Sequence, residues 1–285
     1  MRRKLEISER RACRVIGQPR ATQRYRSRRT TEDWALLKEI LALSAKNPRY
    51  GYRRVWALLR KEGFHVNKKR VHRLWREAGL RVPTRQRKRR RLRAGGSENG
   101  CTRMQAEHKD HLWSYDFVMD RTDDGRRLKM LVVVDEHTRE CLYIGVERSF
   151  TAQGVVKVLA TLFEERGEPT LIRSDNGPEF IARAVRRWLE VCGVKTLYIE
   201  PGSPWENAYA ESFIGRFGDE LLKREVFASL LEAKVLVEEY RKHYNERRPH
   251  SSLGYRTPAE FAVSCEPADM DTAFTKDLQS VTVLS

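Results

Sequence analysis

Three acidic residues in the second half of the chain have the types and surroundings that metal-assisted chemistry requires. Asp116 lies in an alternating run, Trp-Ser-Tyr-Asp-Phe, and Asp175 follows an apolar run, Thr-Leu-Ile-Arg-Ser, just before the turn-forming sequence Asn-Gly-Pro. Both contexts predict strands. Glu211 lies in a helix-forming stretch, one turn after Asn207 on the same helical face. Carboxylates on rigid elements are the oxygen ligands that Mg²⁺ or Mn²⁺ prefers when water and phosphate fill the remaining positions.

These residues and the sequences around them resemble the Asp-Asp-Glu triad of retroviral-integrase-like transposases. Asp116 and Asp175 are followed, after 35 further residues, by Glu211. The segments WSYDF around Asp116, SDNGPEF around Asp175 and YNERRPHSSLGYRTP at 244–258 resemble one branch closely. That branch is the bacterial insertion-sequence transposases encoded in the second of two overlapping reading frames. The resemblance extends over nearly the whole chain.

The resemblance implies a DNA transposase or integrase. Such an enzyme binds the ends of its insertion sequence, nicks DNA and transfers strands by attack of a 3′-OH on a phosphodiester. It would use two Mg²⁺ or Mn²⁺ ions per active site, held by Asp116, Asp175 and Glu211. The resemblance further implies double-stranded DNA as partner, a homo-oligomer on that DNA, and a first-frame transposase protein as partner or fusion. It also implies a bacterial cytoplasmic, nucleoid-associated location.

One position departs from the family pattern. The family usually carries Lys or Arg seven residues after the glutamate, to contact DNA near the scissile phosphate, and this chain has Gly218 there. Arg216 is the nearest cation, on a different side of the predicted helix. Two interpretations stay open: Arg216 substitutes in an active enzyme, or the chain is a catalytically decayed DNA-binding or regulatory protein. A stand-alone nuclease is a lesser alternative.

The net charge of +17 is unevenly distributed along the chain. Residues 1–100 hold 31 Lys and Arg against 8 Asp and Glu, a net +23, whereas residues 101–285 hold 25 against 31, a net −6. The first third therefore predicts a polyanionic partner with salt-sensitive affinity. No apolar run approaches the roughly 18 residues of a membrane span, so no membrane association is expected. The five scattered cysteines argue against a disulfide framework or a cysteine-rich zinc site.

Three predicted helices form a helix-turn-helix domain at 31–81. The first begins near Thr31 and ends at the sequence Asn-Pro, the second covers about 52–62, and the third is capped by Asn67 and ends at Gly79. The inward face of the first is expected to consist of Trp34, Leu37, Ile40, Leu41 and Leu43. Cations on the third would meet DNA as a recognition helix does. They are Lys68, Lys69, Arg70, Arg73 and Arg76.

Two basic segments flank this domain. Residues 1–30 form a basic arm, in which a short helix capped by Ser8 and a solvated chain are equally open. Residues 82–104 form a basic linker, with seven Lys or Arg among residues 85–93. We expect its cations Arg87, Lys88, Arg89 and Arg90 to follow DNA phosphates.

The remaining sequence predicts a mixed α+β and α/β arrangement. Strands at 112–119, 128–135, 141–147, 170–175 and 194–199 alternate, after the first three, with helices at 152–165, 178–191 and 205–222. This order is that of a ribonuclease-H-like catalytic core with a five-stranded mixed sheet, here at 105–225. A C-terminal helix and basic loop at 226–265 and a tail at 266–285 follow. Asn176, Asn207, Arg216, Arg247 and Arg248 are further candidate DNA contacts, and Asp135 is predicted to be a structural turn residue.

Overall fold

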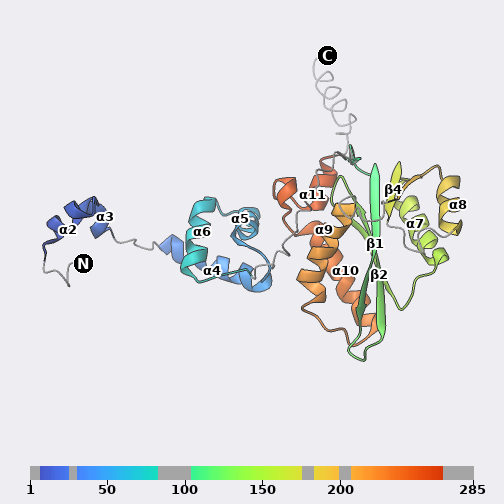
Figure 1. Ribbon diagram of the computed structural model, residues 1–285, viewed down its shortest axis with the longest axis horizontal. Helices are drawn as coiled ribbons and strands as arrows, with labels where there is room; N and C mark the ends of the chain where they lie inside the picture. Colours follow the sequence, from blue (N-terminus) through green and yellow to red (C-terminus); the bar gives the residue numbers. More distant parts are fainter. Residues whose placement is uncertain (1–6, 26–30, 83–103, 175–182, 199–206, 266–285) are drawn as a thin grey trace, which may run out of the picture. The chain divides into compact units, whose positions relative to one another are not determined.

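The computed structural model describes residues 7–25, 31–82, 104–174, 183–198 and 207–265. The chain divides into two compact units, Met1–Val82 and Pro83–Ser285, which are drawn in Figure 1. The first unit begins with two short helices, α2 (Glu9–Val15) and α3 (Arg20–Arg24). The hydroxyl of Ser8 accepts a hydrogen bond from the backbone N–H of Arg11, which caps α2 as the sequence suggested. No membrane-spanning helix is found in the part of the chain that the structure describes.

Three further helices of the first unit form the expected helix-turn-helix module. They are α4 (Thr31–Lys46), α5 (Tyr52–Lys61) and α6 (Lys68–Glu77). Asn67 caps α6 by accepting a hydrogen bond from the N–H of Lys69, and Gly63 takes a left-handed φ of 88° in the connection that precedes it. The helices bury a common apolar core centred on Ile40, Val55, Leu59, Val71 and Leu74.

The expected inward face of α4 was partly wrong. Trp34 and Leu41 are 58% and 44% exposed. The buried apolar positions of α4 are Leu36, Leu37, Ile40 and Leu43. Trp34 and Leu41 are seven residues apart and share one helical face, but that face is turned away from the contact with α5 and α6. Residue type alone could not distinguish these two neighbouring apolar stripes.

The second unit is built on a five-stranded mixed sheet, as predicted. Its strands are β1 (Leu112–Arg121), β2 (Arg127–Asp135), β3 (Cys141–Glu147), β4 (Leu171–Ser174) and β5 (Lys195–Tyr198), in the order β3-β2-β1-β4-β5. β1, β2 and β3 pair antiparallel as hairpins. β4 pairs parallel to both β1 and β5. The parallel pairing brings β4 beside the first residues of β1, Leu112 to Ser114.

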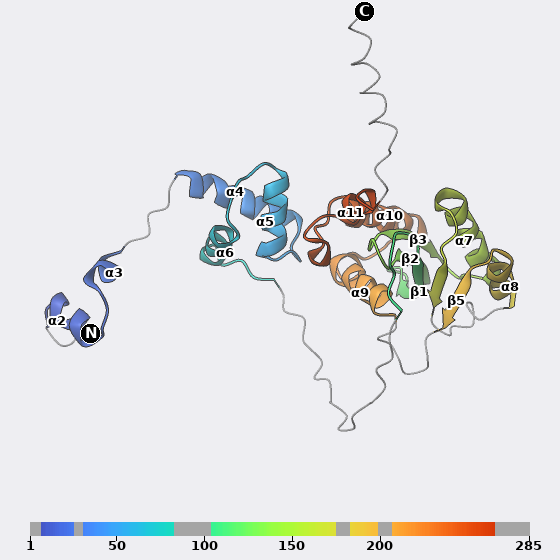
Figure 2. The ribbon, with the colours of Figure 1, turned by 90° about the horizontal axis from the view of Figure 1, so that it is seen from above.

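Helices cover both faces of this sheet. The helices α7 (Ala152–Arg166) and α8 (Arg183–Val191) lie on one side, and α9 (Ala208–Phe217) and α10 (Leu230–Glu246) lie on the other, as Figures 1 and 2 show. Every residue of β2 after Arg127 is buried, because a central strand covered on both faces has no solvent side. The last elements within the described residues are a 3₁₀ turn at Ser251–Leu253 and α11 (Pro258–Val263).

The predicted helix at 205–222 is interrupted. α9 ends at Phe217 and continues directly as a π-helical turn, η2 (Gly218–Leu222). π-Helical turns are rare in proteins, and those that occur are often found at functional sites. Here the turn carries Glu220, whose carboxylate accepts hydrogen bonds from Nε and Nη2 of Arg248, both at 2.7 Å.

Arg248 was expected to face DNA, but in the structure its guanidinium is buried against Glu220. Its side chain is only 1% exposed, and its guanidinium also lies over the Tyr244 ring, 5.4 Å from the ring centroid. A buried guanidinium needs a carboxylate partner, and Glu220 supplies it. Arg248 therefore connects the C-terminal segment to the turn that follows α9. Its neighbour Arg247 is exposed.

We expect Arg248→Met to destabilise the second unit by about 3–5 kcal/mol, because it leaves the Glu220 carboxylate largely buried without its cation. Urea unfolding of the full chain, with hydrogen exchange of the α10 amides, measures the change. The matched control is Arg247→Met at the adjacent exposed position, which should shift stability by no more than about 0.5 kcal/mol. Equal stability of the two variants would contradict the structural role of Arg248.

Candidate catalytic site and DNA-binding surface

Asp116 lies on the face of the sheet that α9 and α10 cover. Side chains alternate along β1, so Trp113 and Tyr115 join the apolar cluster beneath α7 and α8, whereas Val118 joins the cluster beneath α9 and α10. Asp116 has the same parity as Val118 and is half-buried. Its Oδ1 accepts a hydrogen bond from the N–H of Phe117 at 2.7 Å.

Glu211 lies in the first turn of α9, and its side chain is exposed. The opposite side of this helix is anchored by Phe213 and Phe217, which are almost fully buried and contact Tyr240 of α10. α9 packs on β1 and β2. Asp116 and Glu211 therefore belong to elements that pack together on one face of the sheet.

The third predicted carboxylate, Asp175, lies outside the described residues, as do Asn176 and the linker cations Arg87, Lys88, Arg89 and Arg90. β4 ends at Ser174, the residue before Asp175. In the parallel pairing with β1, Arg173 lies opposite Ser114, two residues before Asp116. Within the described ranges, no group of three or more metal-ligating side chains comes together.

Asn207 occupies the N-cap position of α9 and is 2% exposed. It was expected to contact DNA, but its side chain is buried. Among the described residues it makes no side-chain cap hydrogen bond, and its Oδ1 has no hydrogen-bond partner there. A side chain that is 2% exposed does not reach a phosphate directly, so a role in placing the start of α9 fits its position better.

Arg216 and Gly218 differ in their surroundings. Burial raises the pKa of the Tyr244 hydroxyl, and the nearby charges of Arg248 and Arg216 oppose that rise. The charge of Arg216 is therefore close to Tyr244 of α10. The Arg216 side chain is half-buried, whereas Glu211 is exposed. Gly218 has an ordinary helical φ of −60°, and a Cβ added there would meet no atom within 4 Å. The position can therefore accommodate a Cβ without a clash.

Two acids at the end of β2 are buried. Asp135 is the expected structural turn residue, since its carboxylate accepts hydrogen bonds from the N–H groups of Asp110 and His137, while burial raises its pKa. The next residue, Glu136, was not predicted to matter. Its carboxylate accepts two hydrogen bonds from Nη1 of Arg173, at 2.6 and 2.7 Å, and one from the Ser114 hydroxyl at 2.9 Å. An arginine inside the short apolar run of β4 was the available signal, because a buried cation requires a buried acid.

Three of the five predicted cations on α6 contact other helices of the module. Arg70 and Arg73 donate to the two carboxylate oxygens of Asp33 in α4, at 2.7 and 2.9 Å, and Asp33 is 3% exposed. The Nζ of Lys68 lies 4.5 Å from the centroid of the Trp56 ring. These three cations hold the helices of the module together. Lys69 and Arg76 are exposed and, of the five predicted contacts on α6, are best placed to meet DNA without rearrangement.

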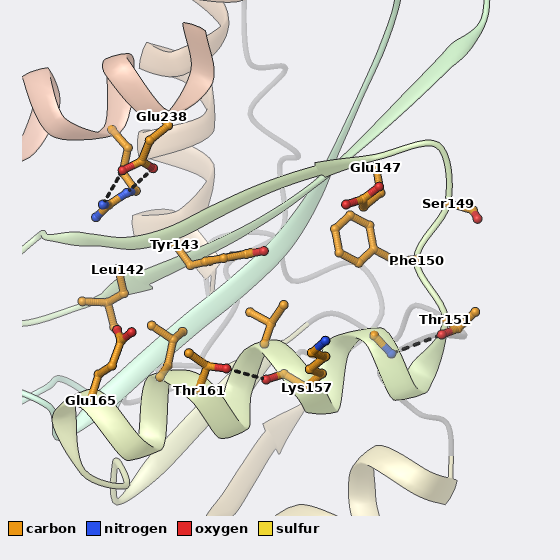
Figure 3. A pocket seen from close by; sticks show the side chains of 14 residues that line it. Leu142, Tyr143, Glu147, Ser149, Phe150, Thr151, Lys157, Thr161, Glu165 and Glu238 are labelled. Atoms are coloured by element: carbon orange, nitrogen blue, oxygen red, sulfur yellow. Dashed lines mark hydrogen bonds and ion pairs between the residues drawn. The ribbon is translucent and has the colours of Figure 1, made fainter. Parts of the chain in front are cut away.

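A hollow of about 580 Å³ lies between β3 and α7, at the edge of the sheet. Figure 3 shows Tyr143 and Glu147 of β3 on one side of it and Lys157 of α7 on the other. None of the predicted site residues lines this hollow. Glu238 and Arg241 of α10 also line it.

Comparison with protein families matches both units. Residues 31–89 match the HTH-like domain, and residues 106–204 and 192–258 match two models of the integrase core domain.

The chain is also similar to individual proteins. It is 41% identical over 275 residues to the insertion element IS407 uncharacterized 31.7 kDa protein of Burkholderia multivorans, and the match covers 96% of this chain and 98% of that protein. It is 31% identical over 255 residues to the transposase InsD for insertion element IS2 of Escherichia coli, covering 83% and 81%. Among solved structures it is similar to the HTLV-2 integrase catalytic core domain in complex with magnesium, at 15% identity and a TM-score of 0.44, covering 55% of this chain and 99% of that one.

We expect Asp33→Asn to loosen the helix-turn-helix module by about 2 kcal/mol at pH 7, since it removes the acceptor of two charged hydrogen bonds. Arg73 and Arg70 lower the pKa of Asp33. A depressed folded pKa means that Asp33 stabilises the fold above the ordinary aspartate pKa of about 3.9, and that this stability is lost as the pH falls through the lower folded value. The difference between wild type and Asp33→Asn should therefore shrink below about pH 4.

Hydrogen-exchange protection of the amides in α4, α5 and α6 measures this difference across the pH range. Glu32→Gln is the matched control, because Glu32 pairs with the same Arg70 but is 80% exposed and should contribute little. A pH-independent difference, or an equal loss in Glu32→Gln, would contradict the prediction.

Proposed function

Because the chain belongs to the integrase-core transposases of insertion elements, we propose that it nicks and joins DNA strands at the ends of its element with Asp116, Asp175 and Glu211. Members of this family are DNA phosphoryl-transfer enzymes. The observation that carries the residue assignment is the shared face of the sheet: the strand bearing Asp116 and the helix bearing Glu211 pack together there.

The donor chemistry at this face fits a divalent metal. Asp116 is a half-buried carboxylate on a central strand and Glu211 an exposed one on a helix that packs over it. Hard oxygen donors on rigid elements suit Mg²⁺ or Mn²⁺. Two such ions, when bound, would activate the attacking oxygen and stabilise the leaving oxygen of the phosphodiester. Asp116, Asp175 and Glu211 are the residues that would hold these ions.

The residues themselves contribute position and charge. The buried side of α9 holds the backbone of Glu211 at a fixed place over the sheet. Since Glu211 is exposed, a DNA strand can approach it without unfolding of the helix. Attack by water on the phosphorus gives a nick with a free 3′-OH, and attack by that 3′-OH on a second phosphodiester joins the strands. Neither step requires a covalent link between protein and DNA.

DNA is the partner that both units support. The helix-turn-helix module presents Lys69 and Arg76 at its surface, and the linker cations would add sequence-independent phosphate contacts. We further propose that the chain acts as an oligomer on paired element ends and together with the first-frame protein of its element, located with the nucleoid in the bacterial cytoplasm.

A DNA-binding protein without strand chemistry is the second candidate. Gly218 favours it, because the family's cation is missing there and Arg216 lies on the α10 side of the helix. The two candidates differ in a single property, which is whether DNA strands are cut and joined after the element end is bound.

We expect Asp116→Asn, Asp175→Asn and Glu211→Gln each to lower strand nicking and joining by at least about 100-fold, since each removes a charge that the transition state requires. The assay uses labelled element-end DNA with Mg²⁺ or Mn²⁺, and a mobility shift on the same DNA checks that binding is retained. Asp120→Asn is the matched control, because Asp120 lies on the same strand but outside the predicted triad. Equal activity of Asp120→Asn and Asp116→Asn would overturn the assignment.

We expect Gly218→Arg to tighten binding to element-end DNA and raise joining about tenfold, since it adds one phosphate contact in open space. Gly218→Ala controls for the gain in helix propensity without the charge. If neither variant changes joining while Arg216→Gln abolishes it, Arg216 already supplies the missing cation, contrary to the prediction.

A further inference from the structure

The buried carboxylate of Glu136 connects two of the three elements that carry the predicted triad. The carboxylate accepts a hydrogen bond from the hydroxyl of Ser114 in β1, two residues before Asp116. It also accepts hydrogen bonds from the guanidinium of Arg173 in β4, two residues before Asp175. The side chains of Glu136 and Arg173 are 0% and 5% exposed, so the pair excludes water and fixes both strands at one point. Arg173 also donates to the carbonyl of Met104 at 3.0 Å.

The same residue is connected to the third element through its backbone. The carbonyl oxygen of Glu136 accepts a hydrogen bond from Nη1 of Arg139. The guanidinium of Arg139 lies over the Tyr209 ring of α9, only 3.5 Å from the ring centroid, a close cation–π contact. Tyr209 is two residues before Glu211. A single turn after β2 therefore contacts β1, β4 and α9, in each case two residues before a predicted catalytic carboxylate.

The backbone of Arg139 has an uncommon conformation for its type. Its φ is +66°, in the left-handed region that glycine adopts without steric cost. A side chain kept at such a position, where glycine would relieve the backbone, indicates that the side chain has a function. The contact with Tyr209 is the function that the geometry provides.

We propose that Glu136 and Arg139 form a clamp that fixes β1, the end of β4 and α9 relative to one another, and so sets the positions of Asp116 and Glu211. The inference rests on the proposed function, because it assumes that these two carboxylates act together with Asp175. Glu136, Arg139, Arg173 and Tyr209 are positioning residues, which act through the elements they hold. The clamp sets the spacing of the carboxylates before metal and DNA bind, so its loss weakens metal binding as well as strand chemistry.

Arg139→Gly in the full-length chain is the sharpest test, because it removes the contact with α9 and relieves the backbone at the same time. Three quantities are measured: Mn²⁺ binding by calorimetry, the rate of joining of element-end DNA, and the thermal unfolding temperature. We expect Mn²⁺ affinity and joining each to fall by at least about tenfold, with no decrease in the unfolding temperature. A residue that only stabilised the fold would lower the unfolding temperature instead.

Variants of Tyr209 complete the test. Tyr209→Ala should reproduce the losses of Arg139→Gly, and the double variant should be no worse than either single variant, because both remove one contact. Tyr209→Phe keeps the ring and should restore Mn²⁺ affinity and joining to within about twofold of wild type.

The possible results separate this inference from the proposed function. Wild-type binding and joining in Arg139→Gly, together with their loss in Asp116→Asn, would overturn the clamp alone. Additive losses in the double variant, or losses that follow a lowered unfolding temperature, would overturn it too. Mn²⁺ binding by the wild-type chain that Asp116→Asn leaves unchanged would overturn the proposed function and the clamp with it.

Discussion

The parallel pairing of β1 with β4 is the constraint on which the rest of the catalytic unit depends. It places β4 beside the first residues of β1, Leu112 to Ser114, although the two strands are separated in the sequence by β2, β3 and α7. Such a pairing needs a long crossover, which α7 provides. Side chains alternate along β1, and Asp116 shares with Val118 the side of the sheet that α9 covers. The position of Glu211 then follows from how α9 packs on that face.

Buried carboxylates that hold arginines recur in both units. Asp33 binds Arg70 and Arg73, Glu136 binds Arg173, and Glu220 binds Arg248. In a chain with a net charge of +17, an arginine near a predicted DNA-binding surface is easily interpreted as a contact to a DNA phosphate. A carboxylate removed from water competes for the same arginine, since leaving either charge buried and unpaired is costly. The cations that remain for DNA are those that no buried acid holds.

The end of α9 is joined to the C-terminal segment. The π-helical turn at Gly218–Leu222 carries Glu220, which binds Arg248, so Arg248 supports the helix that carries Glu211. The glycine that opens this turn occupies the position where the family usually has a cation. The chain thus has a well-anchored α9 with an uncharged residue at that position.

The sequence by itself determined the order of the elements and the identity of the triad candidates. Hydrophobic periodicity and turn residues are local signals, and β3 was predicted with the bounds that the structure has, Cys141–Glu147. Which of two apolar stripes of α4 is buried, so that Trp34 is exposed, was decided only by the packing of α5 and α6. The partners of Arg173 and Arg248 lie 37 and 28 residues away along the chain, and no local pattern joins them. Only the tertiary structure brings Glu136 within reach of three elements, because its contacts depend on strand register and helix packing that act over distances no short stretch of sequence encodes.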